Sequence, residues 1–187
     1  RLSILVPVYG TEKYIERCAR SVLEQDTQYV EYVFVNDCTK DKAVDVLNKT
    51  IEEYPNAQSR IKIINHEKNL GLAGARLTGL QNAEGDYVWF VDSDDYIERN
   101  AIAELLPYMD GVNDLIAFNY MYDKDGEISR FTEKPFTVSN VLINAVSPSI
   151  WKCVTKRSLF FDNGIFPIVG INVSEDYLLI ARLVVAS

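Results

Sequence analysis

Short apolar runs alternate with amphipathic segments through the first 109 residues, and this alternation constrains the fold more than any other feature of the sequence. Leu2–Val8 is almost continuously apolar and is followed by Tyr9 and Gly10, as expected for a strand buried on both faces of a parallel sheet. The next segment has apolar residues on one face at helical spacing, namely Tyr14, Ile15, Cys18, Ala19, Val22 and Leu23. A strand followed by a helix is therefore the first predicted unit.

The same unit is repeated along the chain. A second strand is predicted over residues 30–35, and the helix after it ends at Pro55. A third strand over residues 61–64 precedes a helix over 72–83, and a fourth strand is predicted over 87–91. Such alternation with short connections predicts a right-handed, mostly parallel sheet covered by helices, which is an α/β three-layer domain.

The sequence beyond Met109 has a more mixed pattern. Residues 115–122 and 127–132 flank the turn Asp123-Lys124-Asp125-Gly126, and this arrangement predicts a β-hairpin. No internal repeat, low-complexity tract or linker interrupts the chain. Residues 1–187 are therefore predicted to form one domain.

Charge and hydropathy exclude several classes of function. The chain has 19 Lys plus Arg and 27 Asp plus Glu, a formal charge of −8, so it lacks the overall basic field that attracts nucleic acid or anionic lipid. Its longest apolar runs are well short of the roughly 18 to 20 residues that cross a bilayer, and no signal peptide is visible. We therefore expect a cytoplasmic protein with no transmembrane segment and no nucleic-acid partner.

The cysteine and histidine content limits the metal chemistry. Cys18, Cys38 and Cys153 are odd in number and far apart, which favours reduced thiols over a disulfide framework. His66 is the only histidine, and no two cysteines are close in sequence, so the pattern disfavours zinc. A functional metal would need oxygen ligands, which favours Mg²⁺ or Mn²⁺.

Acidic residues follow the predicted strands. In open α/β sheets, ligands bind beyond the carboxyl ends of the strands, so these positions are candidate site residues. Asp37 follows the second strand, Asp92-Ser93-Asp94-Asp95 follows the fourth, and Glu175-Asp176 opens the final helical run. The first strand is followed by the single glycine Gly10, so neither a dinucleotide-binding fingerprint nor a Walker loop is present.

The segment Asp92-Ser93-Asp94-Asp95 places three carboxylates within four residues after a buried strand. Like charges this close repel one another, and a divalent cation that also binds a diphosphate is the natural neutraliser. The alternative is a solvated turn with an aspartate as helix cap, which is the favoured interpretation of an isolated Asp-x-Asp.

Two further residues have two interpretations each. Asp37 could accept hydrogen bonds from a ribose hydroxyl or a base N–H, or it could cap the next helix, although Thr39 and Asp41 are also available as caps. Arg76 lies in the helix that begins near Asn69-Leu70-Gly71. It could bind a phosphate or form a surface ion pair.

The motifs form an ordered set along the chain. They are Ser3-Ile4-Leu5-Val6-Pro7-Val8-Tyr9, Asn36-Asp37, Asn69-Leu70-Gly71 with Ala75-Arg76, Gly85-Asp86-Tyr87, Asp92-Ser93-Asp94-Asp95, Trp151 and Glu175-Asp176. In order and spacing this set resembles the family 2 glycosyltransferases, which have the GT-A fold, and the resemblance covers nearly the whole chain. It is especially similar to bacterial enzymes that build surface polysaccharides or lipopolysaccharide.

The resemblance implies an inverting, metal-dependent transfer of a sugar from a nucleoside diphosphate donor. It favours a UDP-sugar as donor, Mg²⁺ or Mn²⁺ as cofactor, and a carbohydrate or lipid-linked acceptor. The implied donor-side residues are Pro7, Val8 and Tyr9 at the base, Asp37 at the uracil or ribose, Arg76, Asp92 and Ser93 at the nucleotide-sugar, and Asp92 and Asp94 at the metal.

The resemblance also implies an acceptor side. Asp176 would be the general base, with Glu175 beside it and Trp151 in the wall of the acceptor site. A lone tryptophan is more often part of a core, and Glu175-Asp176 taken alone would be an ordinary helix start. The final residue, Ser187, follows closely on the base motif, so we expect the catalytic domain to be truncated at its C-terminus.

Some residues depart from the pattern of the family. Asn36, Cys38, Gly10 and Leu77 stand where the family commonly has Asp, Gly, Asn and Asn, which puts the identity of the donor in doubt more than the fold. Two other functions stay open, a nucleotidyltransferase that makes an activated sugar and a non-catalytic module that binds a nucleotide-sugar. Contact with the inner face of the membrane and the oligomeric state are also open.

Overall fold

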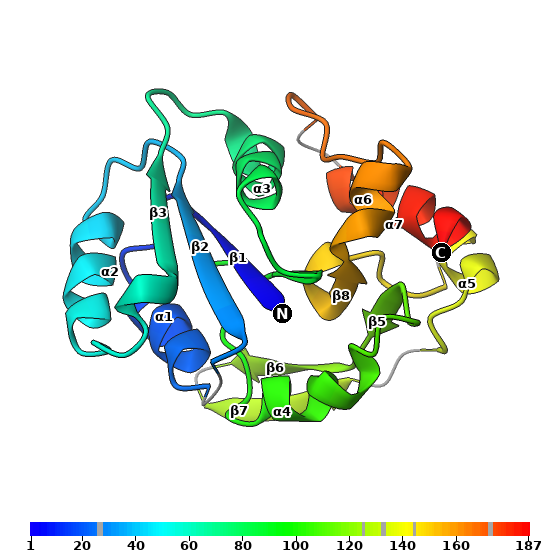
Figure 1. Cartoon of the computed structure of the whole chain (residues 1–187), viewed down its shortest axis with the longest axis horizontal. Helices are drawn as coiled ribbons and strands as arrows, with labels where there is room; N and C mark the ends of the chain where they lie inside the picture. The colour runs from blue at the N-terminus through cyan, green and yellow to red at the C-terminus, as the bar shows by residue number, and fades with distance from the viewer. Residues whose placement is uncertain (26–27, 125, 132–133, 144, 172–173) are drawn as a thin grey trace.

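The computed structural model describes residues 1–187 except 26–27, 125, 132–133, 144 and 172–173, and a six-stranded sheet with the order β3-β2-β1-β4-β8-β5 forms its centre (Figure 1). The strands are β1 (Leu2–Val8), β2 (Val30–Asn36), β3 (Ile61–Asn65), β4 (Tyr87–Phe90), β5 (Leu115–Ala117), β8 (Cys153–Lys156) and, in a separate two-stranded sheet, β6 (Tyr120–Lys124) and β7 (Glu127–Phe131). The helices are α1 (Ile15–Leu23), α2 (Ala43–Glu52), α3 (Gly71–Gln81), α4 (Ala101–Leu105), α5 (Val138–Leu142), α6 (Arg157–Asp162) and α7 (Glu175–Ala186), with 3-10 helices η1 (Gln58–Arg60), η2 (Leu106–Tyr108) and η3 (Ile150–Lys152). In the described parts of the chain, none of these helices combines the length and the apolar character needed to span a bilayer.

Strands β1 to β4 are parallel, as the alternation of strands and helices predicts. β1 lies between two of them, because Leu2 is paired both with Val30 of β2 and with Tyr87 of β4. All seven residues of β1 are buried, in agreement with its apolar sequence. β8 is antiparallel to β4, and β5 is antiparallel to β8, so the sheet is mostly parallel.

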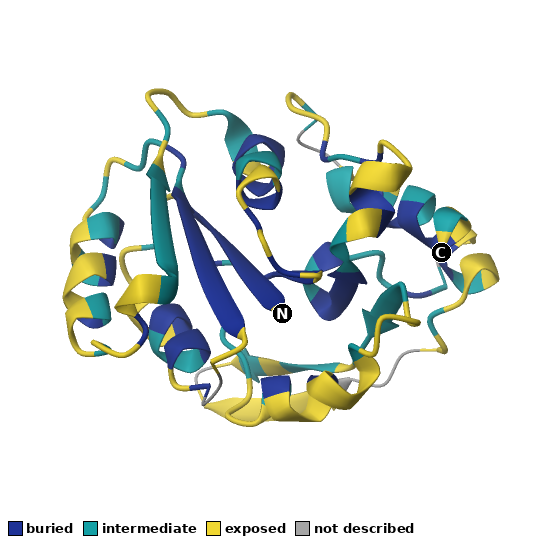
Figure 2. Cartoon of the chain, viewed as in Figure 1, coloured by how far each residue is buried: buried dark blue, intermediate teal, exposed yellow. Residues whose placement is uncertain are grey.

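Helices cover both faces of the sheet, with a hydrophobic core on each side (Figures 1 and 2). Successive residues of β1 point to opposite faces, so Ile4 packs in the core formed with α1 and α2, whereas Leu5 packs in the core formed with α3, α6 and α7. Figure 2 shows β1 buried between these layers. The predicted α/β three-layer arrangement is confirmed.

The predicted hairpin is correct only in part. Residues 115–122 do not form one strand, because Leu115–Ala117 is strand β5 of the main sheet and is paired with β8. The hairpin itself begins at Tyr120, where β6 pairs with β7 across the predicted turn. Asp125 in that turn and Thr132 at the predicted end lie outside the described residues. The sequence pattern gave no sign of the break, since the strand that pairs with β5 comes much later in the chain.

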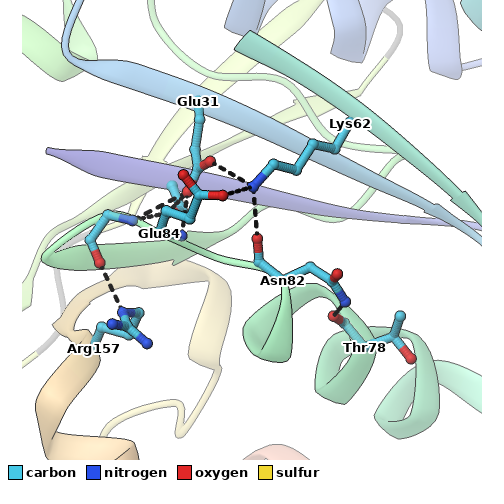
Figure 3. Close-up of polar contacts among 8 residues, drawn as sticks. Glu31, Lys62, Thr78, Asn82, Glu84 and Arg157 are labelled. Atoms are coloured by element: carbon cyan, nitrogen blue, oxygen red, sulfur yellow. Dashed lines mark hydrogen bonds and ion pairs between the residues drawn. The ribbon is translucent and has the colours of Figure 1, made fainter.

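A polar cluster centred on the buried side chain of Glu31 joins the amino ends of the parallel strands, at the edge of the sheet opposite to the strand ends discussed below (Figure 3). Glu31 of β2 is only 4% exposed, and its Oε1 accepts hydrogen bonds from Ser3 Oγ at 2.5 Å and from Gly85 N at 3.1 Å. Lys62 Nζ of β3 lies 3.3 Å from Glu31 Oε2 and 2.6 Å from Glu84 Oε1. A Cβ at Gly85 would lie 2.6 Å from Ser3 Oγ, so this approach requires glycine. The cluster therefore connects the starts of the four parallel strands.

The environment of Glu31 lowers the pKa of its carboxyl group. Burial raises this pKa, but hydrogen bonds from Ser3 and from the Glu84 N–H, together with the ammonium group of Lys62, lower it by more. Because the pKa in the folded state is depressed, Glu31 stabilises the fold above the ordinary pKa of about 4.5. This contribution is lost as the pH falls through the folded-state pKa.

Glu31→Gln is expected to lower the free energy of unfolding by about 1–3 kcal/mol at pH 7, because it removes a buried charge that receives hydrogen bonds and leaves Lys62 without that partner. The deficit should shrink as the pH falls below 4, where the wild-type carboxylate also becomes protonated. Urea unfolding at several pH values measures both effects. Glu84→Gln is the matched control, since its exposed ion pair contributes less than about 1 kcal/mol. A deficit that did not change with pH would contradict this role.

Candidate active site

Three strand ends lie side by side at the carboxyl edge of the sheet. β1 lies between β2 and β4, and the three strands are parallel, so the residues that follow them share one edge. These residues are Tyr9, Asp37 and the Asp92–Asp95 segment. The Asp37 N–H donates to Val8 O at 3.0 Å and ties two of the strand ends together. The predicted position of the aspartates at one edge is confirmed, and their roles stay predictions.

Arg76 of α3 connects carboxylates from two distant segments at this edge. Its side chain is 2% exposed, Nη2 donates to Asp92 Oδ1 at 2.9 Å, and Nη1 donates to Asp176 Oδ1. Glu175 Oε1 lies 3.8 Å from the same Nη1. The fold thus brings Asp92, after β4, to the first turn of α7. A surface ion pair is the wrong interpretation of Arg76, because the residue is buried; its contact with a phosphate stays a prediction.

Asp176 lies in an environment that raises the pKa of its carboxyl group. Burial has the largest effect, and the nearby charges of Asp92 and Glu175 add to it, whereas Arg76 opposes it. Asp176 Oδ2 accepts a hydrogen bond from Ile150 N at 3.4 Å, and 23% of its side chain is exposed. A partly accessible carboxylate with a raised pKa is suited to accept a proton.

The segment after β4 is a turn whose carboxylates crowd one another. The Asp95 N–H donates to Asp92 O at 3.0 Å, and Ser93 is buried while Asp94 and Asp95 are exposed. Partial desolvation and the charges of Asp94 and Asp92 raise the pKa of Asp95 to about 6. The segment therefore forms a turn, as in the interpretation without a metal, and it also concentrates the negative charge that a cation would neutralise.

The donor atoms of this turn fit a cation that is bound together with a ligand. Within the described ranges of the chain, no group of three or more His, Cys, Asp or Glu side chains is arranged to hold a metal ion by itself. Mg²⁺ usually takes one or two carboxylates from a protein and completes its coordination with substrate phosphates and water. Asp94 is exposed and Asp92 is partly exposed, so these two side chains could supply the one or two carboxylate ligands.

Asp37 is buried at the end of β2. The residue is 2% exposed, and its Oδ1 accepts a hydrogen bond from Leu70 N at 2.8 Å and lies 2.7 Å from His66 Nδ1. At the start of α2, Ala43 N donates to Asp41 Oδ1 at 3.1 Å, whereas the hydrogen bonds described for the Asp37 side chain go to other segments. The interpretation of Asp37 as a cap of that helix is therefore wrong. Its contact with a base or ribose stays a prediction.

His66 is a site residue that the sequence reasoning missed. Its ring connects two elements, because Nδ1 lies 2.7 Å from Asp37 Oδ1 and Nε2 lies 2.9 Å from Thr78 Oγ1 of α3. The residue directly follows β3, so the rule about strand ends that identified the aspartates would also have identified this histidine. His66 thereby links the end of β2 to the helix that carries Arg76.

The three residues predicted for the base pocket differ in exposure. Pro7 and Val8 are buried within β1, whereas 52% of Tyr9 is exposed. Tyr9 is therefore the residue of the three with a large side-chain surface available to a ligand. The contacts of all three residues with a base stay predictions.

Trp151 lies in η3 at the same edge of the sheet, next to the residue that contacts Asp176. Its ring packs edge to face on Tyr120 with the centroids 4.9 Å apart, and its backbone oxygen accepts a hydrogen bond from Trp89 Nε1 at 2.6 Å. The residue is partly exposed, so it lies at the border of the core rather than inside it. A contact with an acceptor stays a prediction.

The mostly parallel sheet between two helical layers, with acidic residues after the strands, is the architecture of the GT-A glycosyltransferases. The family model for glycosyl transferase family 2 matches residues 3–165, and the chain belongs to this family. The resemblance that the motifs indicated is thereby confirmed. Membership favours sugar transfer over nucleotidyl transfer.

Curated proteins similar to this chain include bacterial glycosyltransferases. The putative glycosyltransferase EpsH of Bacillus subtilis is 37% identical over 119 residues, which are 64% of this chain and 33% of that protein. The poly(ribitol-phosphate) beta-N-acetylglucosaminyltransferase TarS of Staphylococcus aureus is 35% identical over 113 residues, which are 59% of this chain and 19% of TarS. The chain therefore matches less than half of the length of each of these relatives.

Solved structures of TarS extend this similarity to the whole chain. The crystal structure of TarS residues 1–349 in complex with UDP-GlcNAc superimposes with a TM-score of 0.82 at 25% identity, and it covers 100% of this chain and 54% of that one. The complex with UDP gives a TM-score of 0.83. A mannosyltransferase from Pyrobaculum calidifontis, in complex with GDP-Man and Mn²⁺, has the same fold with a TM-score of 0.71 at 20% identity.

Proposed function

We propose that the protein transfers a sugar, with inversion at the anomeric carbon, from a UDP-sugar to a carbohydrate or lipid-linked acceptor in the synthesis of a bacterial surface polysaccharide. The observation that carries this proposal is the cluster in which Arg76 holds Asp92 and Asp176 together at the carboxyl edge of the sheet. The similarity to TarS, whose structure was solved with UDP-GlcNAc, supports the choice of nucleotide. The cytoplasm or the inner face of the membrane is the proposed location.

The donor side of the proposed site lies at the ends of β1, β2 and β4. Tyr9 after β1 and Asp37 after the neighbouring strand β2 would contact the base and ribose. Pro7 and Val8 at the end of β1 would form the floor of the base pocket. Asp92 and Ser93 would contact the ribose and sugar. Asp94 and Asp92 would hold a divalent cation, Mg²⁺ or Mn²⁺, which when bound neutralises the charge on the departing diphosphate.

The acceptor side of the proposed site is formed by η3 and α7. Asp176 would take the proton from the acceptor hydroxyl as the oxygen bonds to the anomeric carbon and the bond from that carbon to the diphosphate breaks. Its raised pKa and partial exposure support this role. Glu175 and Trp151 would orient the acceptor beside it. A base on the face opposite to the leaving group accounts for inversion.

A donor titration tests the proposed function. Isothermal titration of the full-length protein with UDP-GlcNAc, GDP-mannose and dTDP-glucose in the presence of Mn²⁺ is expected to give the tightest binding for the UDP-sugar. Release of UDP from the bound donor would then separate an enzyme from a non-catalytic binding module. Preference for GDP-mannose, or no binding of any of the three, would overturn the choice of donor.

A further inference from the structure

We propose that Arg76 is a positioning residue that fixes the carboxylate of Asp176 relative to the strand end at Asp92, and the proposal rests on the role of Asp176 as the base. One guanidinium group spans both side chains, with Nη2 on Asp92 Oδ1 and Nη1 on Asp176 Oδ1. The planar group presents its N–H donors in a fixed fork, so the two carboxylates are held in one mutual geometry. A lysine ammonium could not supply this constraint.

Arg76 thus bridges Asp92 and Asp176, and the Arg76–Asp92 side of this bridge is attached to the central sheet. α3 packs closely on the sheet, since a Cβ at Gly79 would lie 3.4 Å from Leu5 Cβ of β1. Asp92 comes two residues after the end of β4, and Val91 N still donates to Leu5 O at 3.0 Å. The central sheet therefore holds the backbone of Arg76 in place while its side chain contacts Asp176.

The Asp176 side of the bridge has little support of its own. The N-cap of α7, Ser174, has a left-handed backbone with φ 58°, and its side chain makes no capping hydrogen bond. The contacts described for the Asp176 side chain come from outside the helix, from Arg76 and from Ile150 N. The position of the first turn of α7 therefore depends on contacts with other elements, of which Arg76 supplies the charged one.

The burial of Arg76 is costly, which argues for a role beyond stability. Its Nε is buried and has no hydrogen-bond partner among the described residues. A buried donor without a partner destabilises a fold, and a buried ion pair gains little over apolar packing. The buried position of Arg76 is therefore explained by the two carboxylates that its Nη atoms hold in place.

The test is a double-mutant cycle between Arg76→Lys and Asp176→Asn. The measurement is UDP release from UDP-GlcNAc with Mn²⁺ and with water as acceptor, on the full-length protein. Arg76→Lys is expected to lower kcat about 10-fold to 100-fold with KM for UDP-GlcNAc changed less than about threefold. Combined with Asp176→Asn it should cause no further loss, because a residue that acts only by positioning the base has no effect once the base is absent.

The control is Arg182→Lys on α7, whose guanidinium donates to Gly164 O on the surface and should leave kcat unchanged. Additive losses in the cycle, or a tenfold rise in KM with kcat unchanged, would overturn the positioning role and favour a contact with the donor. Wild-type turnover of the Asp176→Asn variant would instead remove the proposed base, which is a separate result. If Arg76→Lys does not fold, Arg76→Gln replaces it, and failure of both variants to fold would mean that Arg76 is needed for the fold alone.

A second measurement does not depend on activity or on the identity of the donor. Hydrogen exchange followed by mass spectrometry should show faster exchange at Ile150 and in the first turn of α7 in Arg76→Lys than in the wild type. The peptides of β1 and β2 should be unchanged, because the hydrogen bonds described for Arg76 and Asp176 involve neither strand. Unchanged exchange in α7, or faster exchange throughout the protein, would contradict positioning by Arg76.

Discussion

Asp176→Asn is expected to reduce sugar transfer by about 10²-fold to 10⁴-fold while the affinity for the UDP-sugar stays nearly unchanged. A sugar hydroxyl is a weak nucleophile, and an amide cannot take its proton. Asparagine has nearly the same size as aspartate, and its carbonyl oxygen can still accept the N–H of Arg76. Initial rates with the acceptor and calorimetry with the donor measure the two effects separately.

The matched control for this variant is Asp162→Asn, an exposed carboxylate at the end of α6 that should transfer at the wild-type rate. Removing the charge beside a buried arginine can also destabilise the fold, so thermal unfolding of each variant belongs to the experiment. Near wild-type turnover of Asp176→Asn would exclude it as the base. An equal loss of donor binding would assign the residue to the donor site instead.

Mn²⁺ is expected to strengthen UDP binding, and Asp94→Asn is expected to reduce this enhancement by about tenfold or more. A neutral amide is a poor ligand for a hard cation, and Asp94 is an exposed carboxylate in a turn that concentrates negative charge. Affinity for UDP in the presence of Mn²⁺ and of EDTA, measured by calorimetry for the wild type and the variant, gives the enhancement directly.

Asp95→Asn is the comparison for Asp94, since it removes the same charge one residue further along the turn and should reduce the enhancement less. Asp162→Asn again controls for a change of net charge. If wild-type protein bound UDP equally well with Mn²⁺ and with EDTA, neither Asp92 nor Asp94 would be a metal ligand. A larger loss for Asp95→Asn would move the ligand to that residue.

The positions of the first four strands along the chain could be predicted from the sequence because the physical signal is local. Strands such as Leu2–Val8 are apolar along their whole length, which happens where both faces are covered, and each is followed by a segment with helical periodicity. The same pattern placed Asp37 and Asp92 at strand ends, and parallel strands bring their ends to one edge.

The second half of the chain could not be predicted as well, because its structure depends on contacts between distant segments. Leu115–Ala117 has the composition of a hairpin strand, and it belongs to the main sheet because it pairs with β8, which comes later in the chain. Glu31 gives no sequence signal that it is buried, since its partners Ser3, Lys62 and Gly85 belong to three other segments.

The sequence by itself determined the class of fold, the strand ends that carry the acidic residues and, through the order of the motifs, the resemblance to family 2. Only the tertiary structure decided what surrounds each candidate residue. Its helix alone favours a surface ion pair for Arg76 over a contact with a phosphate, whereas folding buries the residue against Asp92 and Asp176. Ion pairs act over a few ångströms, and residues that are this far apart in sequence come within that distance only when α3, β4 and α7 pack together.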